Sequence, residues 1–164
     1  MKIIIKPKKI TRKNFKKFGD LISTRKAKPI KINDGYAKRF DNLCRINTSL
    51  KKGNTIMSIF SAKKRKFPMN IKIMEKHPLG SQAFVPMNET TFLVFVAPKG
   101  KRPNTKKIES FIVPKQTGVN YKPGVWHFPL ISTKNMNFLV IDRKGIGNNL
   151  VIHNFKNEKI SLKY

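Results

Sequence analysis

The residues best suited to chemistry in this sequence are a glutamate and two histidines. Acids and histidines are scarce, with 8 Asp and Glu and 3 His among 164 residues. Glu75 and His77 are two positions apart, which places both side chains on one face of a β-strand. His127 follows Pro123 and Gly124, a pair typical of a tight turn. Carboxylate and imidazole groups can transfer protons or bind a divalent metal, so these three residues are the first candidates for a functional site.

The face that carries Glu75 and His77 is expected to point into the protein. Ile71 and Ile73 alternate with the same period, so all four side chains share one side of a strand over 70–77. An ionised carboxylate on such a face needs a charged partner, hydrogen bonds or a metal. Desolvation there would raise the pKa of Glu75, which favours acid and base catalysis.

The elements that must position these residues are short strands separated by glycine and proline. A short helix is expected over 11–18, with Thr11 as its N-cap and Gly19 at its end. Strands are expected over 1–6, 55–60, 70–77, 82–86, 91–97, 110–113, 124–127, 137–142 and 149–153. This pattern indicates an all-β sandwich or small barrel with a short N-terminal helix, folded as a single domain over 1–164.

The composition excludes several classes of protein. Cys44 is the only cysteine, which excludes an internal disulfide and a multi-cysteine metal site and suits a reducing compartment. No apolar run approaches the roughly 18 residues that a membrane span needs. The first residues, MKIIIKPKK, lack the apolar core of a signal peptide. We therefore predict a cytoplasmic protein with no membrane partner.

The net charge of the chain raises a nucleic-acid hypothesis. The sequence has 36 Lys and Arg and a formal charge of +28. A polyanion site concentrates such charge on one face and adds aromatic or glycine-rich reading elements. Here lysine is spread along the chain, and no such reading motif is present in the sequence. We expect a solvated charged surface without a specific nucleic-acid partner, while a basic nucleic-acid-associated barrel stays open as an alternative.

Two short motifs around the candidate residues resemble those of the cupin family of small β-barrels. The first cupin motif has a His-x-His pair followed by a glutamate, and the second supplies a last histidine after a proline and glycine turn. Glu75 and His77 stand at the first pair, Gln82 at the glutamate and His127 at the last histidine. No cofactor is demanded by these residues alone. If a divalent metal ion is bound, the resemblance implies His77, Gln82, His127 and Glu75 as its ligands.

Longer strings are similar to those of the ureidoglycolate lyase family, which has the cupin fold and acts in allantoin breakdown. These strings are residues 75–87 (EKHPLGSQAFVPM), 118–130 (GVNYKPGVWHFPL), 141–143 (IDR) and 32–35 (INDG) with Arg39, in the family's order and separations. The resemblance implies a double-stranded β-helix, or jelly-roll, barrel. One departure is Ser61, where many relatives have an arginine; Lys63, Lys64 or Arg65 could substitute for it.

The resemblance also implies an activity, namely cleavage of ureidoglycolate to glyoxylate and urea by a carbon–nitrogen lyase of purine catabolism. It implies Glu75, His77 and His127 as the groups that transfer protons. The residues implied for binding this small anionic substrate are Gln82, Asn120, Arg143, Arg39 and Asn33, with the arginines facing the carboxylate. A homodimer is expected, because the family commonly forms one. A cupin-type protein that binds small carboxylic acids without turnover is the alternative, for which Ser61 is the support.

Overall fold

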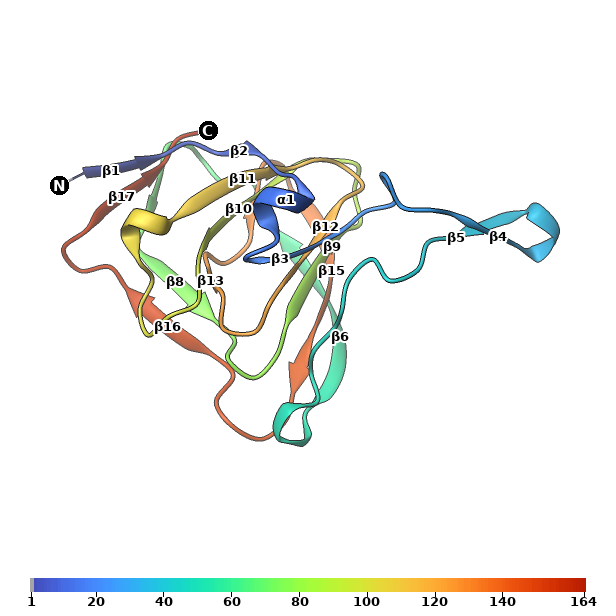
Figure 1. Cartoon of the computed structure of the whole chain (residues 1–164). Coiled ribbons are helices and arrows are strands. Elements are labelled where there is room, and N and C mark those ends of the chain that lie inside the picture. Colours follow the sequence, from blue (N-terminus) through green and yellow to red (C-terminus); the bar gives the residue numbers. More distant parts are fainter. Residues whose placement is uncertain (1) are drawn as a thin grey trace.

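The computed structural model describes residues 2–164 and consists mostly of short strands (Figure 1). The strands are β1 (Lys2–Ile5), β2 (Lys8–Lys9), β3 (Gly19–Ile22), β4 (Ile30–Ile32), β5 (Ala37–Arg39), β6 (Asn54–Ala62), β7 (Met69–Ile71), β8 (Ile73–Lys76), β9 (Gln82–Pro86), β10 (Phe92–Ala97), β11 (Glu109–Val113), β12 (Gly118–Tyr121), β13 (Trp126–His127), β14 (Ile131–Ser132), β15 (Met136–Lys144), β16 (Val151–Asn154) and β17 (Lys159–Leu162). The helices are α1 (Arg12–Phe15) and the 3-10 turns η1 (Asn33–Gly35), η2 (Leu50–Lys52) and η3 (Thr105–Lys107). Within residues 2–164, no helix is long and apolar enough to cross a membrane.

The strands form two facing sheets with a smaller sheet outside one of them. The five-stranded sheet has the order β3-β12-β9-β15-β6, and the seven-stranded sheet has the order β16-β8-β13-β10-β11-β2 with β14 beside β10. A three-stranded sheet has the order β1-β17-β7, and β4 pairs only with β5. The prediction of an all-β, cupin-like barrel with a short N-terminal helix is confirmed.

Two apolar layers hold these sheets together. Inside the barrel, Phe92 of the seven-stranded sheet packs edge-on against Phe138 of the five-stranded sheet, with ring centroids 5.0 Å apart. Behind the seven-stranded sheet, Leu93 and Trp126 pack in a second cluster with Ile160 of the three-stranded sheet. Both faces of β10 are therefore covered, which explains why this strand is a continuous apolar run in the sequence.

The short helix follows the predicted capping chemistry. The Thr11 side chain accepts a hydrogen bond from the Asn14 amide at 3.1 Å, and Asn14 returns one to the Thr11 amide at 2.8 Å. The helix ends earlier than predicted, at Phe15, and Gly19 already begins β3. Phe15 and Phe18 are both fully buried in the barrel core, so the helix closes one side of it.

One predicted strand is wrong in a way that matters for the candidate site. Residues 70–77 form two strands in different sheets, β7 and β8, which are separated at Lys72. Ile71 therefore packs in the outer cluster with Met74 and does not share a face with Glu75. Within β8 the alternation still holds, because Met74 faces outward and Glu75 faces the barrel interior.

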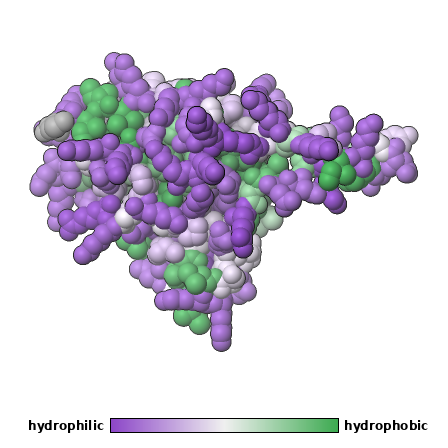
Figure 2. Space-filling model, viewed as in Figure 1, coloured by the Kyte–Doolittle hydropathy of each residue, from purple (hydrophilic) through white to green (hydrophobic). Residues whose placement is uncertain are grey.

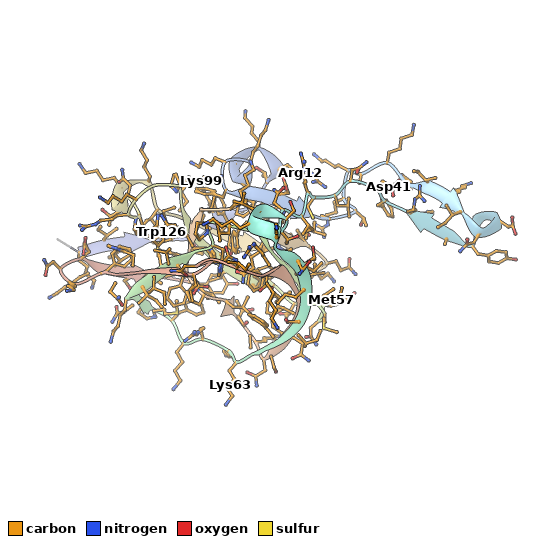
Figure 3. The ribbon with its side chains drawn as sticks, turned by 90° about the horizontal axis from the view of Figure 1, so that it is seen from below. Arg12, Asp41, Met57, Lys63, Lys99 and Trp126 are labelled. Carbon is orange, nitrogen blue, oxygen red and sulfur yellow. The ribbon has the colours of Figure 1, made fainter. Side chains whose placement is uncertain are left out.

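A long projection leaves the barrel between β3 and β6. It contains β4 and β5, which pair antiparallel from Ile30 opposite Arg39 to Ile32 opposite Ala37. Figure 1 shows this hairpin extending away from the body, and Figure 3 shows Asp41 on it, well outside the barrel. The predicted turn at Asn33-Asp34-Gly35 forms its tip.

Candidate active site

The barrel interior brings together the glutamate and two histidines singled out in the sequence. Glu75 lies on β8 directly opposite His127 on β13, and His77 follows the end of β8. The Glu75 Oε1 atom is 3.5 Å from His127 Nε2 and 3.9 Å from His77 Nε2. His127 is 1% exposed. The Glu75 and His77 side chains keep 19% and 16% exposure, so solvent reaches one side of the triad.

Backbone carbonyls hold both imidazoles in one orientation. His77 Nδ1 is 2.7 Å from the Asn149 carbonyl, and His127 Nδ1 is 3.2 Å from the Val125 carbonyl. A carbonyl only accepts hydrogen bonds, so each Nδ1 carries a proton. Both Nε2 atoms are buried without a hydrogen-bond partner and face Glu75. The site therefore presents two buried imidazole nitrogens beside a carboxylate.

The charge state of the triad differs from the prediction made for Glu75. Burial alone would raise the pKa of Glu75, but contact with His127 and the nearby His77 outweighs it, so that pKa lies below its usual value. Burial and the neighbouring His127 lower the pKa of His77. The expected raised pKa of Glu75 is thus wrong, because the sequence could not show that both imidazoles face the carboxylate. At neutral pH the site holds an ionised glutamate and a neutral His77.

Gln82 joins the triad from the opposite sheet. It lies on β9 opposite Tyr121 on β12, with both side chains in the barrel interior. The Gln82 side-chain amide donates to Asp142 at 3.5 Å, and the Gln82 Oε1 and Asp142 Oδ1 atoms are buried without hydrogen-bond partners. Asp142 also acts on the pKa of His77, which places its charge close to the triad. The site therefore also contains one amide oxygen and one carboxyl oxygen that are free to accept hydrogen bonds.

Three contributors to the site were not among the predicted site residues. Tyr121 stacks on His127 with ring centroids 4.3 Å apart and planes 13° from parallel. Burial raises the pKa of Tyr121, so its hydroxyl stays protonated. Tyr121 and Asp142 lie in the strings 118–130 and 141–143, which were the available signals. Asn149 acts through its carbonyl on His77 and its side chain on the Leu79 amide at 2.8 Å, which no sequence pattern reveals.

Asn120 and Arg143 are on the other side of the five-stranded sheet from the triad. Asp142 faces the interior, so the next residue of β15, Arg143, faces outward. Its guanidinium donates to the carbonyls of Leu50, Lys51 and Ile146 at 2.8–3.3 Å. The Asn120 side chain donates to the Arg45 carbonyl at 2.9 Å. The structure therefore does not bring these two residues to the triad.

The other predicted substrate-binding residues are also away from the triad. Asn33 and Arg39 lie on the projecting hairpin, where the Arg39 guanidinium pairs with Asp41 at 3.0 Å. Ser61 is opposite Asn137 near one end of β15, whereas Asp142 lies near the other end. Ser61 is therefore at the end of the β6–β15 pair away from Asp142, and Arg65 lies over the ring of Phe128, 5.8 Å from its centroid.

The triad fits a divalent metal in its chemistry and spacing. Ligand atoms of Glu75, His77 and His127 all lie within 4.8 Å of one another. Tetrahedral ligands about 2.1 Å from a zinc ion would be about 3.4 Å apart, close to the separations from Glu75 to the two imidazoles. Two buried Nε2 atoms without partners and the carbonyls fixing each Nδ1 are the features expected of histidine ligands. The Gln82 Oε1 atom is likewise buried without a hydrogen-bond partner.

Hydrophilic side chains cover much of the surface. Figure 2 shows hydrophilic side chains over most of the visible face of the barrel and along the hairpin. Glu109 forms ion pairs with two lysines, Lys8 and Lys17. Around these pairs, Lys13, Lys16 and Lys122 line the same surface hollow as Lys8 and Lys17.

Comparison with known proteins identifies the family. A family model described as ureidoglycolate lyase matches residues 2–163. The ureidoglycolate lyase of Pseudomonas paraeruginosa (strain DSM 24068 / PA7) is 41% identical over 156 residues, covering 94% of this chain and 92% of the relative. That of Pseudomonas syringae pv. syringae (strain B728a) is 41% identical over 160 residues, covering 97% and 93%. Among solved structures, the sugar 3,4-ketoisomerase QdtA from Thermoanaerobacterium thermosaccharolyticum matches with a TM-score of 0.38 and 14% identity, over 80% of this chain and 85% of that one. The chain belongs to the ureidoglycolate lyase family.

Proposed function

We propose that this protein is an enzyme that cleaves ureidoglycolate to glyoxylate and urea. The observation that carries the proposal is the convergence of Glu75, His77 and His127, whose side-chain oxygen and nitrogen atoms face one another inside a barrel of this family. Membership of a lyase family supports turnover over passive binding of a carboxylic acid. It likewise supports an enzyme over a nucleic-acid-associated barrel.

The reaction needs a proton acceptor next to the carbinol of the substrate. As the hydroxyl proton leaves, its bonding pair forms the aldehyde C=O and the carbon–nitrogen bond breaks, with that pair moving to the ureido nitrogen. The ionised Glu75 carboxylate lies beside both imidazoles and keeps some solvent exposure, so it is suited to accept the hydroxyl proton. Returning this proton to the nitrogen releases urea and restores Glu75, so protons and electrons balance over one turnover.

Gln82 and Asp142 are suited to orient the ureido group. Gln82 offers a free carbonyl oxygen and Asp142 a free carboxylate oxygen, both buried beside the triad. Each can accept a hydrogen bond from a urea N–H. Together they would hold the leaving nitrogen close to the groups that protonate it. We place Asn120 and Arg143 outside this set, because both side chains bind backbone carbonyls on the other face of the sheet.

A divalent metal held by Glu75, His77, His127 and Gln82 would polarise the substrate hydroxyl or carboxylate and supply positive charge beside it. That charge has a use here, since the guanidinium of Arg143 is engaged with backbone carbonyls elsewhere. With the metal bound, the Asn149 and Val125 carbonyls would keep both Nε2 atoms directed at it. We also propose a cytoplasmic homodimer. The free thiol of Cys44 is compatible with a reducing compartment.

The test is an assay of the purified protein with racemic ureidoglycolate, measuring glyoxylate and urea. One sample is treated with a chelator and then divided between no metal and separate additions of Zn²⁺, Mn²⁺, Ni²⁺ and Co²⁺. We expect both products from at least one of these samples. Absence of both products under all of these conditions would refute the proposed activity. Binding of a small carboxylic acid in the same samples, without turnover, would identify the protein as a binding protein instead.

A further inference from the structure

A hollow of about 690 Å³ lies on the outside of the barrel, beside α1. Of its eight lining residues, five are lysines and one, Glu109, is an acid. The lysines come from β2, from α1 and the turn after it, and from the turn after β12: Lys8, Lys13, Lys16, Lys17 and Lys122. The fold thus gathers cations that are far apart in the sequence into one place, here called the lysine hollow.

Glu109 shows that these lysines bind an anionic group. Its Oε2 atom pairs with the Lys8 ammonium and its Oε1 atom with the Lys17 ammonium, so both ammonium groups meet at one carboxylate. Burial alone would raise the pKa of Glu109, but contact with Lys17 and Lys8 outweighs it, so that pKa lies below its usual value. The two lysine side chains keep 54% and 56% exposure, and each ammonium carries three N–H donors. Both can therefore contact a second anion from the solvent side.

Contacts with the body of the protein hold three of the five ammonium groups in place. Lys8 Nζ is 5.2 Å from the ring centroid of Phe111, and Lys17 Nζ is 4.9 Å from that of Phe18. The Lys122 ammonium donates a hydrogen bond to a backbone carbonyl of the turn after α1. Because these groups are already positioned, an anion binds them at a lower cost in side-chain entropy than it would bind freely moving lysines.

The lysine hollow keeps an excess of positive charge after its internal ion pairs. With five lysines and one glutamate, its lining has a net charge of +4. The segment that forms most of it, residues 6–17, also contains Lys6, Lys9 and Arg12 and has no acid. Like charges this close together repel one another, so an anion bound among them would reduce that repulsion.

The donors of the lysine hollow favour linked phosphoryl groups. Ammonium groups are rotatable point charges that suit phosphate oxygens, whereas a planar carboxylate is matched best by the fork of an arginine. The nearby Arg12 guanidinium is engaged with the carbonyls of Leu21 and Ser23 at 3.0 and 2.9 Å. One phosphate group carries a charge of about −1.5 to −2 at pH 7, so a chain of about two or three would balance the excess.

The lysine hollow offers no platform for a nucleobase. None of its lining residues is aromatic, and the rings of Phe18 and Phe111 below its lysines are fully buried. Thr11 and Asn14, its remaining lining residues, bond to each other in the cap of α1. Single-stranded nucleic acids gain affinity by stacking bases on exposed aromatic rings. Recognition here would therefore be limited to the phosphoryl groups of a ligand.

We propose that the lysine hollow binds a short chain of phosphoryl groups, supplied by a free polyphosphate or by the triphosphate of a nucleotide. Glu109 holds Lys8 and Lys17 together, and the exposed Lys13 and Lys16 complete the contacts. This site is outside the barrel and does not depend on the proposed catalytic activity, so its tests need no ureidoglycolate.

The first test measures binding of tripolyphosphate to the full-length protein by isothermal titration calorimetry in 0.15 M KCl. We expect saturable binding to the wild-type protein. The triple variant Lys13→Gln, Lys16→Gln and Lys17→Gln should bind about tenfold more weakly, because it loses three charged contacts. Its circular dichroism melting profile should match that of the wild-type protein. No saturable binding to the wild-type protein would overturn the proposal.

The matched control is the triple variant Lys63→Gln, Lys64→Gln and Lys66→Gln. It has the same net charge as the first variant and also changes exposed lysines. Figure 3 shows Lys63 on the other side of the body from Arg12 of α1. The control should change the affinity for tripolyphosphate less than about twofold, since charges beyond a Debye length are screened. Equal losses in the two variants would show that net charge alone attracts the ligand, which contradicts a site at the lysine hollow.

Glu109→Gln tests the site in the opposite direction. This change removes the internal carboxylate that occupies Lys8 and Lys17. It is expected to tighten tripolyphosphate binding by about threefold or more, because two ammonium groups become free for the ligand. An unchanged or weaker affinity of Glu109→Gln would contradict the proposed contacts.

Two further ligands test the chemical class. ATP should bind within about threefold of tripolyphosphate, because no base is recognised, and citrate should bind about tenfold more weakly, because ammonium groups do not match planar carboxylates. Citrate that binds as tightly as tripolyphosphate would refute the preference for phosphoryl groups. ATP that binds more than about tenfold tighter than tripolyphosphate would refute recognition through the phosphoryl chain alone.

Discussion

At the scale of single residues, the chemistry depends on how the neighbours of Glu75 set its charge. Burial and two imidazoles act on its pKa in opposite directions, and the imidazoles prevail. The carboxylate is therefore ionised near neutral pH and ready to accept a proton or hold a cation. A raised pKa would have made it a proton donor, which is the opposite role.

Replacing Glu75 by glutamine removes this charge while keeping the side-chain volume. We expect kcat/KM for ureidoglycolate to fall by about 100- to 10,000-fold, the usual contribution of a positioned base. The melting temperature should change little, because the glutamine side chain fills the same space. Glu158→Gln, at an exposed acid, is the matched control and should keep wild-type activity. Activity of Glu75→Gln within severalfold of wild type would remove Glu75 from the mechanism.

The pH profile should report on His77. Its pKa in the folded protein lies below the ordinary 6.5 because of burial and the nearby His127. The unfolded chain therefore binds more protons between these two pKa values, so stability is full above pH 6.5 and falls as the pH drops below it. We expect activity to hold down to pH 6.5 and to fall only below it, alongside the melting temperature.

Two variants assign this pH dependence. His153→Gln removes the histidine outside the site and should leave both profiles unchanged, whereas His77→Gln should abolish activity and flatten the loss of stability. An activity that already declines between pH 8 and 7 in the wild-type protein would show that His77 is not shifted in the expected direction.

The sequence predicts the triad better than it predicts the substrate-binding residues. The sequence indicates a site at the triad because acids and histidines are scarce in this chain. Glu75 and His77 also have the spacing of one strand face, and His127 follows a turn. Arg143 and Asn120 lie in equally distinctive strings, but strand alternation turns both away from the interior. That alternation could only be assigned once the register of β12 and β15 was known. The carbonyl of Asn149 leaves no trace in the side-chain pattern at all.

At the scale of elements, Arg143 connects the segment between β5 and β6 to the end of β15 through hydrogen bonds. Its guanidinium binds carbonyls on both sides, from η2 and from the loop after β15. Gly53 and Gly145 allow this approach, since a Cβ on Gly53 would come within 2.2 Å of the Arg143 Nε atom. Arg143 thus organises the loops around the site without contacting the triad.

Arg143→Ala is therefore expected to act on stability more than on substrate binding. Loss of several charge-assisted hydrogen bonds should lower the free energy of unfolding by about 2–4 kcal/mol, or the melting temperature by about 5–15 °C. The KM for ureidoglycolate should change less than about threefold at a temperature where the variant is folded. A large rise in KM with an unchanged melting temperature would instead establish Arg143 as a substrate ligand.

Element prediction was limited mainly by short segments. The buried run of β10 and the alternation in β15 were visible in the sequence, whereas the four-residue strands β3, β12 and β17 were missed. The break between β7 and β8 at Lys72 was also invisible, since period-two alternation continues through it. The strand breaks at Lys72 because β7 and β8 pair with strands of different sheets. The sequence alone does not show which strands pair.

At the scale of the whole molecule, the charge of +28 opposes any contact between two copies. In the proposed homodimer, apolar contacts between the copies must exceed this repulsion. Salt screens surface charges, with a Debye length of about 10 Å at 0.1 M and about 3 Å at 1 M. The dimer should therefore tighten as salt rises.

We expect the dimer dissociation constant to fall at least tenfold between 0.05 and 0.5 M NaCl, measured by sedimentation equilibrium. Binding to a random DNA duplex should fall over the same range, because it depends on phosphate attraction alone. Duplex binding that persists at 0.5 M salt would revive the nucleic-acid alternative. A dimer that dissociates as salt rises would mean that ion pairs, and not apolar contacts, hold it together.

The measurement that tests the central claim most directly is the product balance of one reaction. Ureidoglycolate labelled with ¹³C at both carbonyl carbons and the carbinol carbon is incubated with the wild-type protein and with Glu75→Gln, and the products are followed by NMR. We predict equal amounts of glyoxylate and urea from the wild-type protein and neither above the uncatalysed rate from the variant. Release of ammonium and carbonate in place of urea, or equal rates for the two proteins, would contradict a lyase acting through Glu75.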